Sequence, residues 1–249
     1  MTVRVISLLL TTLLAACGVR HVAPAPHATV REPEPDRAAA PPPPARPLPA
    51  PVAYAQLPCI DGPEVAQWEQ HFASHRQQWR SLIVGPRRGG RHLPTVRRMV
   101  QDAGLPPGLA LLPAIESGFH ADARGSHGSA GLWQLSAATA RRHGLVVNET
   151  RDDRFDVERS TLVAIDLLRD LHARYGTWPL ALAAYNAGEG RVNRARRGRP
   201  GASFWDLAAE GRLPPVTRTY VPKFLGLVRF ATGEWICRPG GGPSTVAAR

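Results

Sequence analysis

The sequence predicts a mostly α-helical fold, and two observations support that prediction. From about residue 60 onward, large apolar side chains recur at intervals of three or four residues, which is the spacing of one face of a helix. In the same region no segment alternates apolar and polar residues as a half-buried strand does. Glycine and proline follow the apolar segments at positions where helices end or begin. We therefore expect one helical domain over residues 59–238.

The first three helices are predicted from this spacing and from the prolines around it. A long amphipathic helix is expected to end at Gly85-Pro86. Pro94 would then lie in the first turn of a second helix that runs to Gly104, because a proline there costs no intrahelical hydrogen bond. A short helix over residues 109–116 follows. The apolar face of the first helix consists of Trp68, Phe72, His75, Trp79 and Leu82 or Ile83.

Four more helices are predicted further along the chain. Their ranges are about 136–143, 157–175, 179–187 and 217–232. Ser136 is the expected N-cap of the first of them, and Pro222 lies in the first turn of the last one or kinks it. Residues 189–215 lack the helical pattern, and we interpret them as loops. Their basic cluster is interpreted as a solvated face, with contact to peptide carboxylates or to the membrane as the alternative. It consists of Arg191, Arg194, Arg196, Arg197 and Arg199.

The first residues indicate export. A short basic start precedes an apolar run over residues 5–16, which is too short to span a bilayer but typical of a secretory signal. Leu14-Ala15-Ala16-Cys17 resembles the lipobox of bacterial lipoproteins, which implies a signal peptide over residues 1–16 and acylation of Cys17. Gly18 then favours the periplasmic face of the outer membrane. Ordinary cleavage nearby, with a free cysteine, is the alternative.

Both ends of the domain carry sequence of a different composition. Residues 17–58 are rich in proline and alanine, cannot form a core, and are predicted to be a semi-rigid tether. Residues 239–249 are predicted to be a flexible tail.

Cys59 and Cys237 lie near the two ends of the domain, and we predict a disulfide between them because exported proteins retain disulfides. Two free thiols are the alternative.

The charge of the chain restricts its partners. The formal net charge is +11, and Lys223 is the only lysine. A basic exported protein is attracted to anionic polymers. Nucleic acid is a poor candidate, because the protein is expected outside the cytoplasm and its aromatic residues show no stacking pattern. An anionic cell-wall or membrane surface fits better.

One carboxylate lies in an unusual position. Glu116 directly follows the apolar residues 109–115, so its carboxyl is expected at the bottom of a cleft. Desolvation disfavours the charged form of such a group and raises its pKa toward the range of a general acid. A structural glutamate, bonded to backbone N–H groups or paired with an arginine, is the alternative for an isolated residue of this kind.

Three further motifs favour a catalytic role for Glu116. Small residues at 128–131 precede Leu132-Trp133-Gln134, which presents an indole ring and an amide. Ala184-Tyr185-Asn186-Ala187-Gly188 places a phenol and an amide at a helix end, and Thr219-Tyr220-Val221-Pro222-Lys223 adds another phenol. Amides and phenols beside an aromatic platform are suited to recognise a neutral, N-acetylated sugar polymer.

Together and in this order, the motifs resemble the lytic transglycosylases of glycoside hydrolase family 23, in the branch of membrane-bound lytic murein transglycosylase D. The resemblance covers roughly residues 62–232 and implies a goose-type, lysozyme-like fold behind the lipoprotein signal and tether. It identifies Glu116 as the catalytic acid and base. The substrate-binding residues that it implies are Ser117, Trp133, Gln134, Tyr185, Asn186 and Tyr220.

The resemblance also implies the partners of the protein. Peptidoglycan glycan strands are the expected substrate. The lipid on Cys17 is expected to make the membrane contact, and cell-envelope machinery is a further candidate partner. We expect a monomer that binds no nucleic acid and needs no cofactor and no metal ion. The sequence departs from the family in two respects. The branch usually carries C-terminal LysM modules, and our hypothesis is that the lipid tether substitutes for them. Val216 stands where the family commonly has a glutamate.

The family mechanism needs one acid only. Asp122 is the nearest second carboxylate in the sequence, and we interpret it as a turn or cap residue. The resemblance implies that Glu116 protonates the glycosidic oxygen and then removes a proton from the sugar's own C6 hydroxyl. A lysozyme-like muramidase at the same site and a catalytically silent peptidoglycan-binding lipoprotein are the alternatives.

Overall fold

The computed structural model of the 249-residue chain describes residues 62–232. The predictions on the signal peptide, Cys17, the tether, the Cys59–Cys237 disulfide and the tail lie outside these residues. Among the helices of the described part, none combines the length and the apolarity that crossing a bilayer requires.

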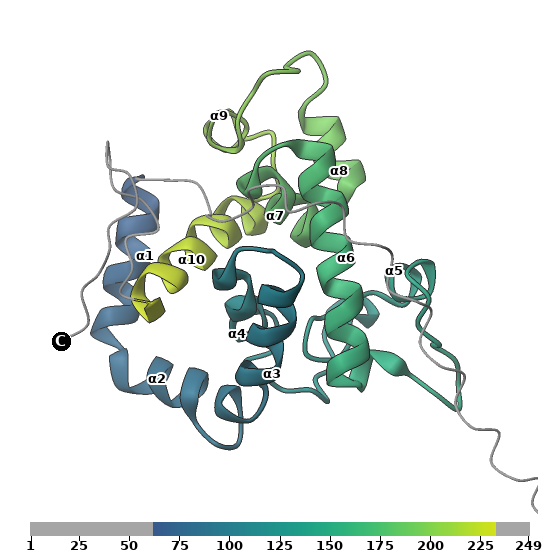
Figure 1. Ribbon diagram of the computed structural model, residues 1–249. Helices are drawn as coiled ribbons and strands as arrows, with labels where there is room; N and C mark the ends of the chain where they lie inside the picture. Colours follow the sequence, from purple (N-terminus) through teal and green to yellow (C-terminus); the bar gives the residue numbers. More distant parts are fainter. Residues whose placement is uncertain (1–61, 233–249) are drawn as a thin grey trace, which may run out of the picture. The chain divides into compact units, whose positions relative to one another are not determined.

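The described part is mostly helical, which confirms the predicted fold class (Figure 1). Pairing between strands is limited, within residues 62–232, to isolated β-bridges such as the one between Ala130 and Leu135. The α-helices are α1 (Pro63–Ser74), α2 (Arg76–Val84), α3 (Gly89–Asp102), α4 (Leu112–Glu116), α5 (Ala137–Arg142), α6 (Val157–Tyr175), α7 (Trp178–Ala187), α8 (Glu189–Ala195), α9 (Phe204–Ala209) and α10 (Pro215–Thr232). Short 3₁₀ turns cover Pro107–Leu111, Ser126–Gly128 and Asp153–Phe155.

Helix α7 forms the centre of the core. It is apolar on nearly all sides, and six consecutive residues from Pro179 to Ala184 are buried, as expected for a helix surrounded by protein. α6, α8 and α10 all pack against it. The helix ends at Gly188, whose φ of 84° is accessible to a residue without a Cβ. α7 therefore holds Tyr185 and Asn186 on a rigid support.

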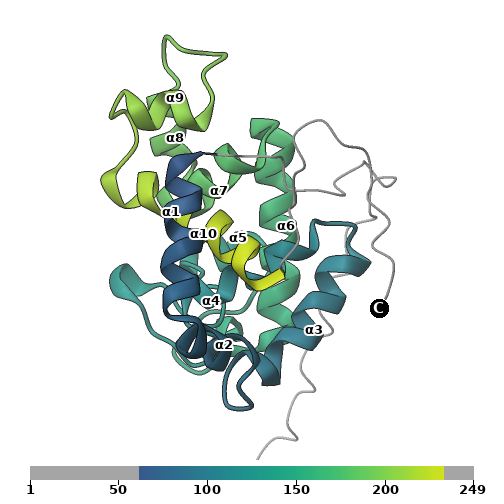
Figure 2. The same cartoon turned by 90° about the vertical axis from the view of Figure 1, so that its left-hand side faces the viewer.

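Helices α1 and α10 pack closely along each other, as both views show (Figures 1 and 2). At Gly226 a Cβ would lie 2.7 Å from Trp68 Cβ and 2.9 Å from the Glu69 backbone nitrogen, so only glycine fits. Arg229 of α10 binds Glu69 of α1 at 2.9 Å. This contact fixes the helix that carries Tyr220.

The helix predicted to end at Gly85-Pro86 is broken into α1 and α2. His75 leaves the helical conformation with φ −111° and ψ 30°, although it satisfies the apolar spacing. α1 packs on α10, whereas α2 packs mainly on α3, so the two segments serve different neighbours. The predicted start of the next helix near Pro94 is also wrong, because α3 begins at Gly89 and holds Pro94 in its interior.

The interpretation of residues 189–215 as loops is wrong in part. α8 starts directly after Gly188 and buries Val192 and Ala195. In α9, Ser203 and Asp206 form a capping box, in which each side chain bonds the backbone of the other residue. Both helices span only two turns or less, too few residues for apolar periodicity to reveal them.

Candidate active site

Glu116 is the last residue of α4, and its carboxyl contacts α10. α4 is anchored by Leu112, Pro113 and Ala114, which are buried, so the helix can carry a polar residue at its end. Oε1 of Glu116 accepts a hydrogen bond from the hydroxyl of Tyr220. The expected position of the carboxyl at the end of an apolar helix is thus seen, with a phenol as its partner.

The environment of Glu116 favours the protonated carboxyl. Burial raises the pKa of Glu116 to about 7, while the hydrogen bond from Tyr220 acts in the opposite direction. Desolvation dominates because an ionised carboxylate loses more solvation than one phenol restores. A carboxyl with a pKa near neutrality can donate a proton and accept one back under the same conditions.

Two phenols surround this carboxyl and stay protonated. Burial, reinforced by the nearby Glu116 carboxylate, raises the pKa of Tyr220 well above its ordinary value. The same two causes raise the pKa of Tyr185. The hydroxyl of Tyr185 donates to the backbone oxygen of Trp133 over 2.8 Å. Both side chains therefore act as neutral hydrogen-bond donors beside Glu116.

The loop over residues 117–136 joins α4 to α5, and side chains that were predicted to contact substrate fix its conformation. The amide nitrogen of Gln134 donates to the Gly131 oxygen over 2.9 Å, and its amide oxygen accepts from Ser129 Oγ over 2.8 Å. Ser117 Oγ donates to the backbone oxygen of Leu132 over 2.8 Å. These bonds tie the loop to the end of α4, next to Glu116. Gln134 also holds a left-handed φ of 50°, a conformation that costs free energy in a residue with a side chain.

The predicted role of Trp133 as an aromatic platform is wrong. The side chain of Trp133 is fully buried, and its indole N–H donates to Thr161 Oγ1 of α6 over 2.9 Å. A large apolar ring gains more from burial in the core than from exposure in a loop. Trp133 contributes to the site through its backbone oxygen, which binds Tyr185.

Asn186 lies next to Tyr185 at the end of α7. Its amide oxygen accepts a hydrogen bond from Thr217 Oγ1 of α10 over 2.9 Å. Among the described residues, no hydrogen bond engages the amide nitrogen of Asn186. The structure thus brings Glu116, Tyr185 and Tyr220 together, with Asn186 and Ser117 adjacent to them in the chain.

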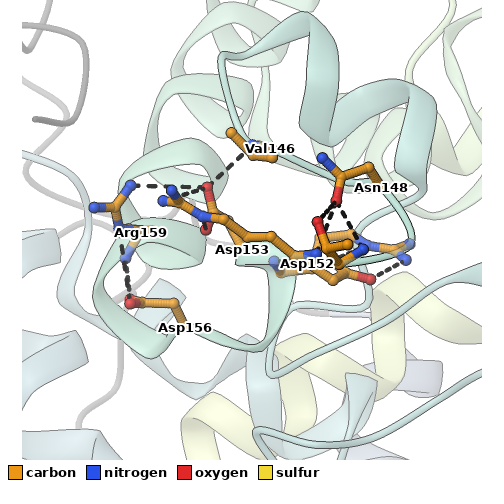
Figure 3. A network of polar contacts seen from close by, with 9 residues as sticks. Val146, Asn148, Asp152, Asp153, Asp156 and Arg159 are labelled. Carbon is orange, nitrogen blue, oxygen red and sulfur yellow. Dashed lines mark hydrogen bonds and ion pairs between the residues drawn. The ribbon is translucent and has the colours of Figure 1, made fainter. Parts of the chain in front are cut away.

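A second group of acids follows the loop in the sequence, and arginines form ion pairs with these carboxylates (Figure 3). Asp153 accepts from Arg151 over 2.7 Å and from the Val146 backbone nitrogen over 3.0 Å. Asp156 caps α6 by accepting from the Arg159 backbone nitrogen. These carboxylates are therefore structural. Asp122 is exposed, and within residues 62–232 no three His, Cys, Asp or Glu side chains are grouped as a metal site.

Arg154 was not predicted as a site residue, yet it holds the loop in place. It is buried, pairs with Asp152 at 2.6 Å, and donates from Nη1 to the backbone oxygens of Gly128 at 2.7 Å and Leu135 at 3.1 Å. Its own backbone oxygen would lie 1.8 Å from a Cβ on Gly131. The sequence places arginines and acids close together over residues 151–159, which indicates ion pairs, but it does not indicate that Arg154 binds a distant loop.

Residues 97–207 match the protein family described as "Transglycosylase SLT domain". This range is less than half of the chain, and the match agrees with the family that the motifs resemble. The matched range contains Glu116, Gln134, Tyr185 and Asn186, whereas Tyr220 on α10 lies beyond it.

Known proteins are similar over part of the chain. Membrane-bound lytic murein transglycosylase D of Escherichia coli K12 is 40% identical over 134 residues, which are 51% of this chain and 28% of the relative. Membrane-bound lytic murein transglycosylase F of Maricaulis maris is 38% identical over 139 residues, 49% of this chain and 29% of the relative. The chain therefore spans less than a third of the length of these relatives. Among solved structures, an inactive mutant of lytic transglycosylase Slt from Pseudomonas aeruginosa matches with a TM-score of 0.48 and 23% identity, covering 66% of this chain and 29% of that one.

Proposed function

We propose that this chain is a lytic murein transglycosylase that cleaves the β-1,4 bond between N-acetylmuramic acid and N-acetylglucosamine without water. The product would carry a 1,6-anhydro-N-acetylmuramic acid end. The observation that carries the proposal is the carboxyl of Glu116, which has a pKa of about 7, is bonded to the hydroxyl of Tyr220 and, unlike Asp152, Asp153 and Asp156, is not paired with an arginine among the described residues.

The proposed reaction uses Glu116 twice. Protonated Glu116 gives its proton to the glycosidic oxygen as the bond from C1 to that oxygen breaks. The acetamido oxygen of the muramic acid stabilises the positive charge at C1. The carboxylate then takes the proton of the C6 hydroxyl while O6 bonds to C1, which closes the anhydro ring and restores the acid. Atoms and protons balance without a second carboxylate and without water.

The arrangement of the other acids supports a one-carboxylate route. Glycosidases that use two carboxylates hold them roughly 5 to 10 Å apart across the bond. Asp152, Asp153 and Asp156 are engaged by arginines and backbone N–H groups. Tyr220 keeps the carboxyl of Glu116 in place, and Tyr185 anchors the facing loop. Asn186 offers its amide nitrogen, and Ser117 and Gln134 shape the adjoining wall of the site.

The proposal is tested by mass spectrometry of fragments released from purified peptidoglycan by the full chain and by Glu116→Gln. We expect fragments that are lighter by one water than hydrolysis products, and none with Glu116→Gln. Glu64→Gln, which changes an exposed glutamate of α1, is the matched control and should release the same fragments as wild type. Hydrated ends would identify a muramidase. Retained cleavage by Glu116→Gln would remove Glu116 as the acid, and binding without cleavage by the wild type would leave a peptidoglycan-binding protein.

We further propose that acylated Cys17 attaches the protein to the periplasmic face of the outer membrane. The lipobox-like sequence before Cys17 and the tether after it support this, and the relatives named above are described as membrane-bound. Cys17→Ala should move the protein from the membrane fraction to the soluble fraction of cells. Unchanged fractionation would contradict the lipid anchor.

A further inference from the structure

The segment that forms α2 and α3 carries charges of a single sign. Between Glu69 and Asp102 the sequence contains seven arginines and no acidic residue. They lie on α2, on the turn after it and on α3, which are neighbours at one side of the helical domain (Figure 2). They are Arg76, Arg80, Arg87, Arg88, Arg91, Arg97 and Arg98.

Four of these arginines line one open groove, here called the basic groove. Its lining includes Arg76, Arg80, Val84, Pro86, Arg87 and Arg88, and its volume is about 830 Å³. The side chain of Val84, which is 63% exposed, can make an apolar contact with a ligand in the groove. A groove of this size holds a chain of several small residues, in the range of ordinary ligand sites.

The basic groove is held in shape by its backbone. Cβ atoms at Gly85, Gly89 and Gly90 would lie 2.1, 1.8 and 2.3 Å from backbone oxygens of α2, so the turn packs on the helix end as only glycine allows. Backbone bonds of 3.0 Å join Arg88 N and Gly90 N to the Gly85 oxygen. The turn that carries Arg87 and Arg88 is thus fixed against the end of α2 before any ligand binds.

Within residues 62–232, three arginines of the basic groove have no acidic partner. Across residues 62–232, no carboxylate forms an ion pair with Arg80, Arg87 or Arg88. Elsewhere arginines such as Arg151, Arg154 and Arg174 are paired with Asp or Glu at 3.0 Å or less. A guanidinium that is left without a carboxylate, beside three others, favours an anionic ligand.

One arginine of the basic groove contacts the segment that follows the proposed catalytic residue. A Cβ on Gly118 would lie 3.2 Å from Nη1 of Arg88 and 3.7 Å from Leu82 Cδ1 of α2. Gly118 is only two residues after Glu116, so the guanidinium of Arg88 contacts the segment that carries the acid. A polymer cleaved at Glu116 would therefore pass within reach of the groove.

We propose that the basic groove binds the carboxylates of peptide stems carried by the glycan strand, which makes stem-bearing strands the preferred substrate. This inference rests on the proposed function. A guanidinium group can bind a carboxylate through two parallel hydrogen bonds, and a stem peptide supplies several carboxylates on a flexible chain. A membrane surface fits less well, because the groove is concave and its Arg88 contacts Gly118, two residues after Glu116.

The test is a binding measurement by calorimetry with the full chain bearing Glu116→Gln. The probes are a muramyl tripeptide with free carboxylates and the same molecule with its carboxylates amidated. We expect the free form to bind roughly fivefold more tightly or better, as for one or two exposed charge-assisted pairs. Arg80→Gln with Arg87→Gln should abolish this difference.

The matched control is Arg97→Gln with Arg98→Gln, which removes the same charge from exposed positions of α3 outside the groove. It should keep the discrimination, and circular dichroism should show that both double variants are folded. Equal binding of the two probes to the unaltered groove, or an equal loss in both double variants, would overturn the proposal. So would Arg80- and Arg87-dependent binding to phosphatidylglycerol vesicles without binding of the free tripeptide, which would assign the groove to the membrane.

Failure of this inference is distinguishable from failure of the proposed function. Cleavage of a glycan strand without stem peptides depends on Glu116 alone in the proposed mechanism. If wild type releases anhydro products from such strands while the probes bind equally, the groove proposal is wrong and the function stands. If no anhydro product appears from any strand, the function itself is wrong.

Discussion

Tyr220 and Glu116 lie 104 positions apart, yet the hydroxyl of Tyr220 donates a hydrogen bond to Oε1 of Glu116. The contact joins α10 to the end of α4, and each helix is fixed separately, α10 by α1 and α4 by its buried residues. The bond lowers the pKa that burial raises, so the value of about 7 results from two opposing causes. The carboxyl is therefore tuned by a residue that belongs to neither its helix nor its loop.

Tyr220→Phe should shift the pH dependence of cleavage upward. Removal of the hydrogen bond leaves burial unopposed, so the pKa of Glu116 should rise above about 7. Because the proposed acid is the protonated form, activity is lost as pH rises through this pKa, and in the variant that loss should occur at higher pH. The maximal rate should fall roughly tenfold or more, since the carboxyl is no longer positioned. A rate profile on peptidoglycan from pH 4 to 9 measures both effects.

The control is Tyr175→Phe, which also removes a phenol that bonds a side chain, here Asn193 at 2.9 Å, in another part of the domain. Its profile should match that of wild type. An unchanged profile for Tyr220→Phe would mean that the phenol does not tune the acid.

Glu116 should also make the protein less stable at alkaline pH. Its pKa in the folded protein is about 7, against 4.5 for the ordinary group, so the folded state binds more protons than the unfolded state between these values. Stability is then fully present below pH 4.5 and is lost as pH rises through about 7. Glu116→Gln removes this loss, and its free energy of unfolding should exceed that of wild type by up to about 3 kcal/mol at pH 8.

Urea unfolding at pH 5 and pH 8 measures this difference. Asp122→Asn, a change at an exposed carboxylate, should show no comparable gain at pH 8. A stability gain for Glu116→Gln that is the same at both pH values would exclude titration as its cause.

The sequence predicted some parts of the fold because local rules decide them. α6 runs over Val157–Tyr175 as expected, since Asp156 caps it, apolar residues recur along it, and Gly176 ends it in the left-handed conformation. No local sequence rule predicts the interruption of the helix at His75. It depends on the different neighbours of α1 and α2, which are α10 and α3. Motifs placed Glu116, Tyr185 and Tyr220 in one site. Burial of Trp133 and the contact of Arg154 with the loop depend on α6 and on long-range packing, which spacing does not reveal.

Arg154→Gln should reduce both stability and activity by releasing the loop. The change removes the ion-pair partner of Asp152 and the side-chain donor to the oxygens of Gly128 and Leu135, of which the Leu135 oxygen still accepts from the Ala130 backbone nitrogen. The pair is only partly buried, because Asp152 is partly exposed, so thermal unfolding should report a loss of about 1 to 3 kcal/mol, as for a lost hydrogen bond to a charged group. Because Arg154 acts on substrate only through the loop, the Michaelis constant should rise more than the maximal rate falls.

The double variant Asp152→Asn with Arg154→Gln distinguishes a positioning role from a stability effect. It removes the unpaired charge and should recover part of the unfolding free energy while the Michaelis constant stays high. Arg159→Gln is the control, because its ion pairs with Asp153 and Asp156 are long, 3.7 and 3.8 Å, and do not involve the loop. Recovery of the Michaelis constant together with stability would argue that the loop is not positioned by Arg154.

Gly226→Ala should loosen the contact between α1 and α10. The new Cβ would lie 2.7 Å from Trp68 Cβ and 2.9 Å from the Val65 oxygen, and backbone cannot move aside as a flexible side chain can. Overpacking of this kind costs about 1 to 3 kcal/mol. Gly190→Ala is the matched control, because Gly190 lies within α8 with no atom within 4 Å of its Cβ position, and alanine there should be neutral or stabilising by up to about 1 kcal/mol. Since α10 carries Tyr220, Gly226→Ala should also disturb the bond to Glu116 and lower the rate of cleavage, whereas Gly190→Ala should not. Equal stability of the two variants would show that the helices separate at little cost, and α10 could then not be the rigid support that the acid requires.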